Sequence, residues 1–472
     1  MSTEKTELVV IGGGPGGYAA AFRAADLGKS VTIVDPEPLL GGTCLLRGCI
    51  PSKALITAAE LAESIRGAGA IGIEAGPVTV HMDRLSQWRQ NIITQIGKGL
   101  GELAKRRNVR WIRGTARFAD LRHLSIAAEG IPETTMEFDQ AIIATGARPT
   151  FPTGLEPDGQ LVIGSTEALE LDHVPKQLLV VGGGYIGLEL GTCFRLLGSA
   201  VTIVELTAGL LPGTDTELVR PVHRKLDSKG VRVMLESRVT ALRKMADSVE
   251  VEIQPFRGAT VIRNFDRVLV CVGRGANTSN LSLDRAEVQT DARGFIVCDA
   301  QGRTSRSEIF AVGDCSGGPL LAHKARRDGL VAAEAICGQS STRDQLTVPA
   351  VVFSDPEIAY CGISESEAVS AGHEILIGRF PFAVLGRAAT QRAPEGLVKL
   401  IADRATEQVL GVGIVGPSAS ELIAEATLAI ELGAKVHDLM HTIHAHPTLS
   451  EAIPEAAELV RGASIHIYKK GR

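Results

Sequence analysis

Short apolar runs alternate with helical stretches along the first part of the chain. Residues 8–11 form an apolar run that predicts a buried β-strand, and the alanine-rich residues 18–28 are typical of a helix. Residues 30–35 then predict a second strand that ends on an acid. The order strand, helix, strand indicates a parallel α/β arrangement.

A glycine-rich turn, residues 12–17, joins the first predicted strand to its helix, and residues 178–205 repeat the whole unit at a constant offset. The aligned pairs are Gly12 with Gly182, Gly14 with Gly184, Gly17 with Gly187, and Asp35 with Glu205. In dinucleotide-binding turns the first glycine permits the tight bend, the second admits a pyrophosphate, and the third lets the helix pack on the strand. One copy alone could serve only turn geometry. Two copies, each with an acid at the same spacing, predict two bound dinucleotides.

The acid of the second copy indicates which nicotinamide cofactor binds. The carboxylate of Glu205 would repel the 2′-phosphate of NADP, and residues 206–213 offer no arginine to hold one. We therefore expect NAD.

Two further segments have the pattern of an apolar strand that runs into glycine with arginine nearby. They are residues 141–150 and 267–278, where we expect the chain to pass between nucleotide-binding domains, although ordinary strand-to-loop transitions would explain either one alone. Residues 309–315 predict another strand, which ends at Asp314. From local sequence, this acid would either bind a cofactor hydroxyl or cap the next helix.

The pattern changes beyond about residue 350. Alternating β-like runs at 349–355, 398–403 and 408–416 are followed by a helical stretch at 418–433. This order predicts a separate α+β domain.

Composition limits the classes of partner. The 49 basic and 54 acidic side chains give a formal net charge of −5, spread along the chain. This balance argues against nucleic acid or an anionic membrane as a partner. The polar start, MSTEKTE, argues against a signal peptide, and no apolar run reaches the roughly 18 residues that a membrane span needs. We expect a soluble, cytoplasmic protein.

Two cysteines, Cys44 and Cys49, lie close together shortly after the first glycine turn. No second Cys or His pair follows at ligand spacing, so a metal site is disfavoured, and a reducing compartment disfavours a structural disulfide. The remaining alternatives are a buried inert pair and a redox-active pair. A flavin would suit the second, because it exchanges two electrons with both a dithiol and a nicotinamide. The other cysteines are expected to be core residues, namely Cys193, Cys271, Cys298, Cys315, Cys337 and Cys361.

Thiol–disulfide exchange needs a base, and the clearest candidate lies near the C-terminus. His446 precedes Pro447, and Glu451 follows where a turn into a helix would bring its carboxylate to the imidazole. The alternative is a set of three surface histidines, His441, His444 and His446, beside a solvated acid at a helix start. The cysteine pair favours the first interpretation.

Taken together, these residues resemble the FAD-dependent pyridine nucleotide–disulfide oxidoreductases, and most closely their dihydrolipoamide dehydrogenase subfamily. The resemblance spans almost the whole chain. It is carried, in family order, by residues 41–55, 144–149, 182–191, 312–315, 318–325 and 444–452. Of these, the segments around the cysteine pair and around His446 are the most specific.

The resemblance implies a redox-active Cys44–Cys49 disulfide with separate roles for its two sulfurs. Cys49 would lie against the flavin, and Cys44 would exchange with lipoyl sulfur. His446, held by Glu451, would be the acid–base group and would come from the other subunit of a homodimer. Electrons would pass from dihydrolipoyl groups on a carrier protein, through the disulfide and FAD, to NAD⁺.

The resemblance also implies cofactor contacts. Lys53 and Glu189 would pair near the flavin N5, and Tyr185 would cover its nicotinamide side. Further cofactor-binding residues would be Thr43, Ala116, Thr145, Gly146, Gly273, Asp314 and Ala322. No metal is expected.

We therefore predict an α/β fold with two Rossmann-like dinucleotide-binding domains and a C-terminal α+β dimerisation domain. The predicted boundaries are 1–150 for the FAD-binding domain, 151–277 for the NAD-binding domain, 278–346 for a central segment that completes the FAD site, and 347–472 for the dimerisation (interface) domain.

Two departures from the common family pattern leave questions open. Residues 45–47 read Leu-Leu-Arg, and the Arg47 guanidinium would either stabilise a thiolate or point to solvent. Arg326 and Arg327 stand where many members carry acids, which leaves the identity of the lipoyl carrier open.

The alternatives to this function lie in related flavoproteins and in a non-enzymatic role. A glutathione reductase-like enzyme is disfavoured by Glu205. A mercuric reductase would carry a C-terminal cysteine pair, whereas no cysteine follows Cys361, and a soluble transhydrogenase would lack the redox pair. A redox-silent flavoprotein scaffold would have lost one of the catalytic residues, all of which remain.

Overall fold

The computed structural model describes residues 4–128, 130–345 and 347–468. The chain divides into two compact units. The first is Met1–Thr153, Gly164–His173 and Val272–Asp344, and the second is Gly154–Ile163, Val174–Cys271 and Gln345–Arg472. The four-domain division expected from sequence is finer than these units and stays a prediction.

The first unit is built on a mostly parallel sheet. Its strands are β1 (Glu4–Ile11), β2 (Val31–Val34), β3 (Arg110–Ile112), β4 (Thr115–Phe118), β5 (His123–Ala128), β6 (Ile131–Ile143) and β17 (Ile309–Ala311). The order is β3-β2-β1-β6-β5-β4, with β17 also paired to β6. Strands β4 and β5 add antiparallel pairings. The strands predicted at residues 8–11, 30–35 and 309–315 are β1, β2 and β17.

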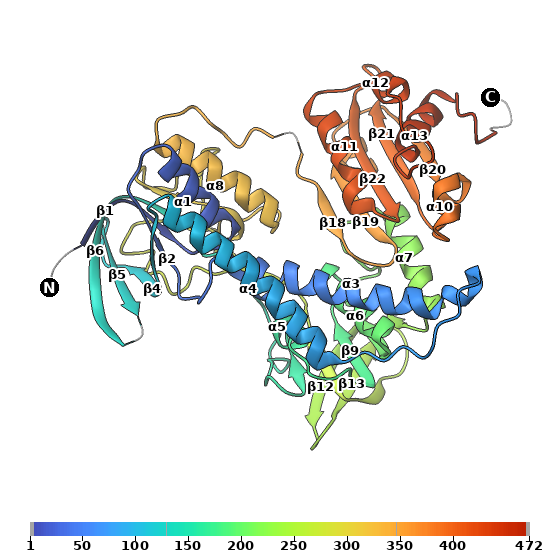
Figure 1. Ribbon diagram of the computed structural model, residues 1–472, viewed down its shortest axis with the longest axis horizontal. Coiled ribbons are helices and arrows are strands. Elements are labelled where there is room, and N and C mark those ends of the chain that lie inside the picture. The colour runs from blue at the N-terminus through green and yellow to red at the C-terminus, as the bar shows by residue number, and fades with distance from the viewer. Residues whose placement is uncertain (1–3, 129, 346, 469–472) are drawn as a thin grey trace. The chain divides into compact units, whose positions relative to one another are not determined.

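Helices and short turns complete the first unit. They are α1 (Pro15–Asp26), α2 (Gly42–Arg47), α3 (Cys49–Arg66), η1 (Ala68–Ile71), α4 (Met82–Arg106), α5 (Ser165–Leu169), η2 (Gly313–Ser316) and α8 (Ala322–Ile336). Helices α1 and α8 lie side by side (Figure 1). The two helices can approach this closely because residue 329 is glycine. A Cβ at that position would lie only 2.3 Å from the carbonyl oxygen of Gly16.

The two joining segments predicted from sequence pair with each other. Strand β7 (Ala147–Pro149) and strand β16 (Arg274–Ala276) form an antiparallel ribbon in the first unit. The guanidinium of Arg274 donates to the carbonyl oxygen of Ala147. Both segments therefore meet where the chain leaves and re-enters this unit.

The second unit begins with another parallel sheet, of order β11-β10-β9-β15-β8. Its strands are β8 (Val162–Ile163), β9 (Gln177–Val181), β10 (Ala200–Val204), β11 (Arg232–Met234) and β15 (Arg267–Val270). Helices α6 (Tyr185–Leu197) and α7 (Thr216–Ser228) connect them. A separate antiparallel sheet consists of β12 (Ser237–Lys244), β13 (Val249–Pro255) and β14 (Val261–Phe265).

The C-terminal part of the second unit is an antiparallel sheet of order β18-β19-β22-β21-β20. Its strands are β18 (Ala350–Val352), β19 (Glu357–Gly362), β20 (Ile375–Pro381), β21 (Leu397–Asp403) and β22 (Val409–Gly416). Its helices and turns are α9 (Glu365–Ser370), η3 (Phe382–Val384), α10 (Gly386–Thr390), α11 (Ala419–Glu431), α12 (Val436–His441) and α13 (Ala452–Arg461). The predicted α+β pattern, with its strands and long helix, is confirmed, and so is the overall α/β fold class.

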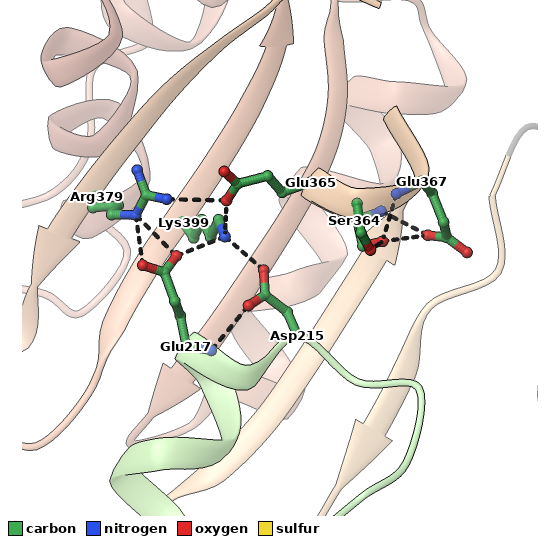
Figure 2. Close-up of polar contacts among 8 residues, drawn as sticks. Asp215, Glu217, Ser364, Glu365, Glu367, Arg379 and Lys399 are labelled. Atoms are coloured by element: carbon green, nitrogen blue, oxygen red, sulfur yellow. Dashed lines mark hydrogen bonds and ion pairs between the residues drawn. The ribbon is translucent and has the colours of Figure 1, made fainter. Parts of the chain in front are cut away.

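A buried ionic cluster ties α7 to this sheet (Figure 2). The ammonium of Lys399, on β21, lies 2.5–2.6 Å from one carboxylate oxygen each of Asp215, Glu217 and Glu365. Arg379, on β20, also binds Glu217 and Glu365, at 2.9 and 3.0 Å. The Lys399 side chain is only 3% exposed. Its charge therefore compensates acids from segments far apart in the sequence.

The prediction for the scattered cysteines is confirmed for three residues and wrong for three. Cys193, Cys315 and Cys361 are buried. Cys271, Cys298 and Cys337 are only partly buried, because each lies just beyond a strand, in a loop or at a helix end rather than inside a packed element. Among the described residues, no helix is both long enough and apolar enough to cross a membrane.

Candidate active site

The two glycine turns have the same geometry. Gly12 has φ +109° and Gly182 has φ +110°, a conformation that side chains rarely adopt. A Cβ on Gly17 would lie 1.9 Å from the Gly12 carbonyl oxygen, and one on Gly187 would lie 2.0 Å from that of Gly182. The tight bend and the close packing of helix on strand that the sequence predicts are therefore present in both copies.

The acid of each copy is held by its own turn. In the first copy, Asp35 accepts hydrogen bonds from the N–H groups of Gly13 and Glu37. In the second, Glu205 accepts from Gly183 N at 2.6 Å and from Thr207 N at 2.7 Å. Burial raises the pKa of Asp35, although the two N–H groups oppose this. Both carboxylates are thus oriented before any ligand binds.

The cysteine pair spans the junction of two helices in the first unit. Cys44 lies within α2, and Cys49 is the first residue of α3, with Gly48 between the helices. A Cβ on Gly48 would lie 2.8 Å from the Thr43 carbonyl oxygen, so the break requires glycine. A helix N-terminus stabilises a thiolate, and Cys49 occupies that position.

The two thiols are not equivalent. The hydrogen bond to Cys49, together with burial, raises the pKa of the Cys44 thiol, and the positive charge of Lys53 opposes this. Both effects favour the protonated form of Cys44. The position of Cys49 at the start of α3 is the one that would stabilise a thiolate in the reduced pair.

The dithiol segment is attached directly to the first glycine turn. Gly41 N donates to the Gly13 carbonyl oxygen at 2.8 Å. A Cβ on Gly42 would lie 2.6 Å from the Gly14 Cα, so the two backbones are in contact. No side chain caps the N-terminus of α1 at Gly14. The first glycine turn, which is suited to bind a phosphate, is therefore in direct contact with the segment that carries the two cysteines.

Arg47 takes neither of the two roles left open by the sequence. Its guanidinium forms an ion pair with the Glu37 carboxylate, and both side chains are partly exposed. Glu37 N in turn donates to Asp35. The positive charge that acts on the Cys44 thiol is that of Lys53, and Arg47 belongs to the loop that holds Asp35.

Asp314 lies in the η2 turn and does not cap α8, whose N-cap residue is Leu321. Burial raises the pKa of the Asp314 carboxyl, and the charges of Arg274 and Lys324 oppose this. Of the two alternatives for Asp314, a cap of α8 is excluded, and binding of a cofactor hydroxyl stays a prediction.

Sequence reasoning missed the fully buried Asp328, which supports the same turn. Asp328 accepts from Gly313 N at 3.1 Å and pairs with Lys324 at 2.8 Å and Arg343 at 3.1 Å. The i,i+4 spacing of Lys324 and Asp328, which would place both on one face of a helix, was the available signal.

The other cofactor residues expected in the first unit lie on strands, turns and helix starts. Thr43 is exposed in α2 and Lys53 lies in α3, whereas Ala116 is buried in the β4–β5 hairpin. Thr145 and Gly146 follow β6 and are bound by Asn277 through its side chain and backbone, at 3.2 and 3.0 Å. Gly273 accepts from Thr150 N at 3.0 Å, and Ala322 begins α8. Their contacts with a cofactor stay predictions.

The expected base is assembled in the second unit. His446 Nδ1 lies 2.9 Å from Glu451 Oε1, and Thr448 N donates to Glu451 Oε2 at 2.8 Å. Burial opposes ionisation of Glu451, but the hydrogen bonds from Thr448 and His446 lower its pKa. Among the described residues, Nε2 of His446 has no partner, and the side chain is 79% exposed. The imidazole can therefore exchange a proton at Nε2 while Glu451 stabilises its charged form.

Two further expected cofactor residues lie on α6. Tyr185 is its first residue and is exposed, whereas Glu189 is buried and accepts from Phe353 N at 3.0 Å. Gly184 precedes the helix as its N-cap. Lys53 belongs to the first unit and Glu189 to the second, so their pairing stays a prediction.

A cavity of about 470 Å³ lies beside the residues that follow Glu205. It is lined by Leu206, Ala208, Glu236, Ser237, Arg238, Gln254, Pro255 and Phe256. Sequence reasoning missed the contribution of Arg238 and Phe256, because strands β12 and β13 bring them beside Leu206 and Ala208 from outside the nucleotide motif. The hydrophobic periodicity of the sequence does not predict that Arg238 and Phe256 lie beside this cavity.

Comparisons with known proteins agree over the whole chain. Residues 6–329 match the family described as pyridine nucleotide-disulphide oxidoreductase, and residues 348–457 match its dimerisation domain.

Named relatives cover nearly the full length. "Dihydrolipoyl dehydrogenase 2" of Haloarcula marismortui is 44% identical over 466 residues, and "Dihydrolipoyl dehydrogenase" of Haloferax volcanii is 44% identical over 472 residues. In each case 98% of this chain and 98% of the relative are covered. The crystal structure of LpdA from Mycobacterium tuberculosis matches with a TM-score of 0.89 and 29% identity, covering 96% of this chain and 99% of that one.

Proposed function

Because the chain belongs to the pyridine nucleotide-disulphide oxidoreductase family, we propose that it oxidises dihydrolipoyl groups on a carrier protein to the lipoyl disulfide and reduces NAD⁺ to NADH. The observation that carries the proposal is the contact between the dithiol segment and the first glycine turn, at Gly41 and Gly13. The dihydrolipoyl dehydrogenases that share 44% identity with this chain support the choice of substrate.

The residues of the first unit fit FAD. The uncapped start of α1 and the open backbone at Gly14 suit a pyrophosphate, and Asp35 suits a ribose. Asp314 would bind a further hydroxyl of the cofactor. When bound, FAD would accept an electron pair from the dithiol and pass it to NAD⁺. Glu205 and the cavity beside it would hold the adenosine end of NAD.

The chain's own residues carry out the exchange at sulfur. One thiolate of the substrate would attack Cys44 in the Cys44–Cys49 disulfide, so that a mixed disulfide forms and Cys49 leaves as the thiolate. The second substrate thiolate would then displace Cys44, closing the lipoyl disulfide. His446 Nε2 would accept the proton of the attacking thiol, and Glu451 would stabilise the resulting imidazolium.

The enzyme would act as a homodimer in which His446 of one chain serves the dithiol of the other. The match to a dimerisation domain supports this, as do the highly exposed side chains around His446. We further propose a cytoplasmic location, because the cysteines outside the redox pair are scattered along the chain, as is usual in a reducing compartment.

The test is turnover by the FAD-containing enzyme. Dihydrolipoamide should reduce NAD⁺ much faster than NADP⁺, and lipoylated carrier proteins should then be compared as substrates. Activity only with NADPH and glutathione disulfide would contradict the proposal.

A second candidate function is that of an NADPH-dependent disulfide reductase. Arg238 lines the cavity beside Glu205 and could hold a 2′-phosphate. The buried Glu205 carboxylate opposes this, because it is fixed by Gly183 and Thr207 and would repel the phosphate. The cofactor comparison distinguishes the two functions.

A further inference from the structure

The side chain of His444 ties the segment 442–447, which carries His446, to Glu425 of α11. Ile443 is 97% exposed, and Ala445, His446 and Pro447 are also exposed. His444 is the exception, with a side chain that is only 9% exposed. The His444 side chain therefore helps to fix the position of this segment, together with the Thr442 hydroxyl, which donates to the Asp438 carbonyl oxygen, and the contact of His446 with Glu451.

Both ring nitrogens of His444 face acceptors. Nδ1 lies 2.9 Å from the Thr442 carbonyl oxygen, and Nε2 lies 2.7 Å from Oε1 of Glu425 on α11. A carbonyl oxygen only accepts, so Nδ1 carries a hydrogen, and an ionised carboxylate requires one on Nε2 as well.

The two histidines of this segment consequently differ in what they can do. His446 uses Nδ1 for Glu451 and leaves Nε2 without a partner among the described residues. His444 has both nitrogens engaged, so it cannot transfer a proton without giving up an anchor. Charge-assisted hydrogen bonds of this kind are roughly twice as strong as neutral ones.

We propose that His444 is a positioning residue, whose imidazole ties segment 442–447 to Glu425 and thereby holds His446 in place. The inference rests on the proposed function, since it takes His446 as the acid–base group. Glu425 of α11 fixes the path of the backbone, and Glu451 at the start of α13 orients the reacting ring. Two carboxylates from separate helices thus hold two histidines of one segment.

Loss of the contact between His444 and Glu425 should slow the thiol–disulfide exchange step, in which His446 accepts a proton. A misplacement of the acid–base group by about 1 Å can lower a rate by roughly 100-fold. In His444→Gln we expect kcat with dihydrolipoamide and NAD⁺ to fall roughly 10- to 100-fold, with little change in KM. Reduction of an artificial electron acceptor by NADH does not need His446 and should keep its rate.

The experiment compares FAD-containing His444→Gln, Glu425→Gln and the double variant with wild type. His441→Gln is the matched control, because His441 lies in the same region, is exposed and contacts the ring of His437. If the two residues act as one anchor, the double variant should be no slower than the slower single variant. The pH–rate profile should keep its shape, since His446 and Glu451 remain. Amide hydrogen exchange in 442–447 should accelerate in both single variants and stay unchanged in the control.

Three results would overturn the inference: a kcat of His444→Gln within twofold of wild type, additive losses in the double variant, or disappearance of one limb of the pH profile. The last would make His444 itself the proton-transfer group. If wild type fails to oxidise dihydrolipoamide, the proposed function fails instead, and hydrogen exchange still reports on the anchor. If His444→Gln does not fold, Glu425→Gln provides the same test.

Discussion

Arg47, which stands between the two cysteines in sequence, forms its ion pair with Glu37 and not with either sulfur. Glu37 donates its backbone N–H to Asp35, the acid of the first nucleotide turn. The charge that opposes the rise in the Cys44 pKa comes from Lys53. Arg47 therefore supports the nucleotide loop, although its position in sequence suggests a role at the dithiol.

The first prediction concerns Arg47→Ala. We expect the pH dependence of the thiolate–flavin absorbance to be unchanged, because Lys53 remains. Stability should fall by less than about 1 kcal/mol, since the Arg47–Glu37 pair is partly exposed. Titration of the long-wavelength band tests the first point, and denaturant unfolding tests the second. A clear shift of the thiol pKa would show that Arg47 acts at the sulfur after all.

His446→Gln should lose dihydrolipoamide turnover by roughly 10²- to 10⁴-fold, because general acid–base catalysis contributes rate factors of that size. Flavin content and the dimer should be retained, since His446 is exposed and packs against little of the core. Steady-state rates, flavin absorbance and gel filtration measure the three properties. A near-normal rate would exclude His446 as the base.

Lys399→Met should destabilise the second unit by roughly 3–5 kcal/mol, because it leaves three carboxylates without their buried counter-charge. Figure 2 shows how these acids converge on the ammonium. The control is Lys225→Met, which breaks the more exposed pair with Glu395 and should cost less than about 1 kcal/mol. If denaturant unfolding shows the same loss of unfolding free energy in both variants, the Lys399 cluster contributes no more stability than the more exposed pair of Lys225 with Glu395.

The Lys399 cluster also predicts a pH dependence. Burial lowers the pKa of Lys399, but its hydrogen bonds to the three carboxylates outweigh this and raise it above 10.5. Its contribution is therefore complete below pH 10.5 and is lost as pH rises through the folded-state pKa. Burial raises the pKa of Glu217, but hydrogen bonds from Lys399 and Arg379 bring it below 4.5. The contribution of Glu217 is therefore lost as pH falls through that lower value.

The measurement is the difference in unfolding free energy between wild type and Lys399→Met as a function of pH. This difference in unfolding free energy should be constant across the neutral pH range and should become smaller at low pH and at high pH. A difference that grows above pH 10.5 would contradict the assigned charges.

Glu205→Gln should weaken the preference for NAD⁺ over NADP⁺ by roughly tenfold or more, because it removes a negative charge and keeps an acceptor for Gly183 N–H. The ratio of kcat/KM for the two cofactors is the measurement. Glu236→Gln alters an acid that lines the cavity beside Glu205 and should leave this ratio unchanged. The same effect in both variants would point to net charge and not to Glu205.

Local sequence was sufficient for the features that depend on neighbouring residues. The glycine turns, their strands and the acids Asp35 and Glu205 follow from spacing, because a turn that tight accepts only glycine and a strand end fixes where the next side chain lies. The contact of His446 with Glu451 was likewise predictable, since both lie at one helix start.

Tertiary structure decided the features that join distant segments. The partner of Arg47, the support of Gly313 by Asp328, and the approach of Arg238 to the segment after Glu205 depend on packing between elements that no local pattern relates. The fold also gave His444 and His446, which lie two residues apart, different partners. The amino-acid sequence determines which side chains are available. Only the fold determines how many hydrogen-bond acceptors each imidazole meets, and that number decides whether its proton is held or can be transferred.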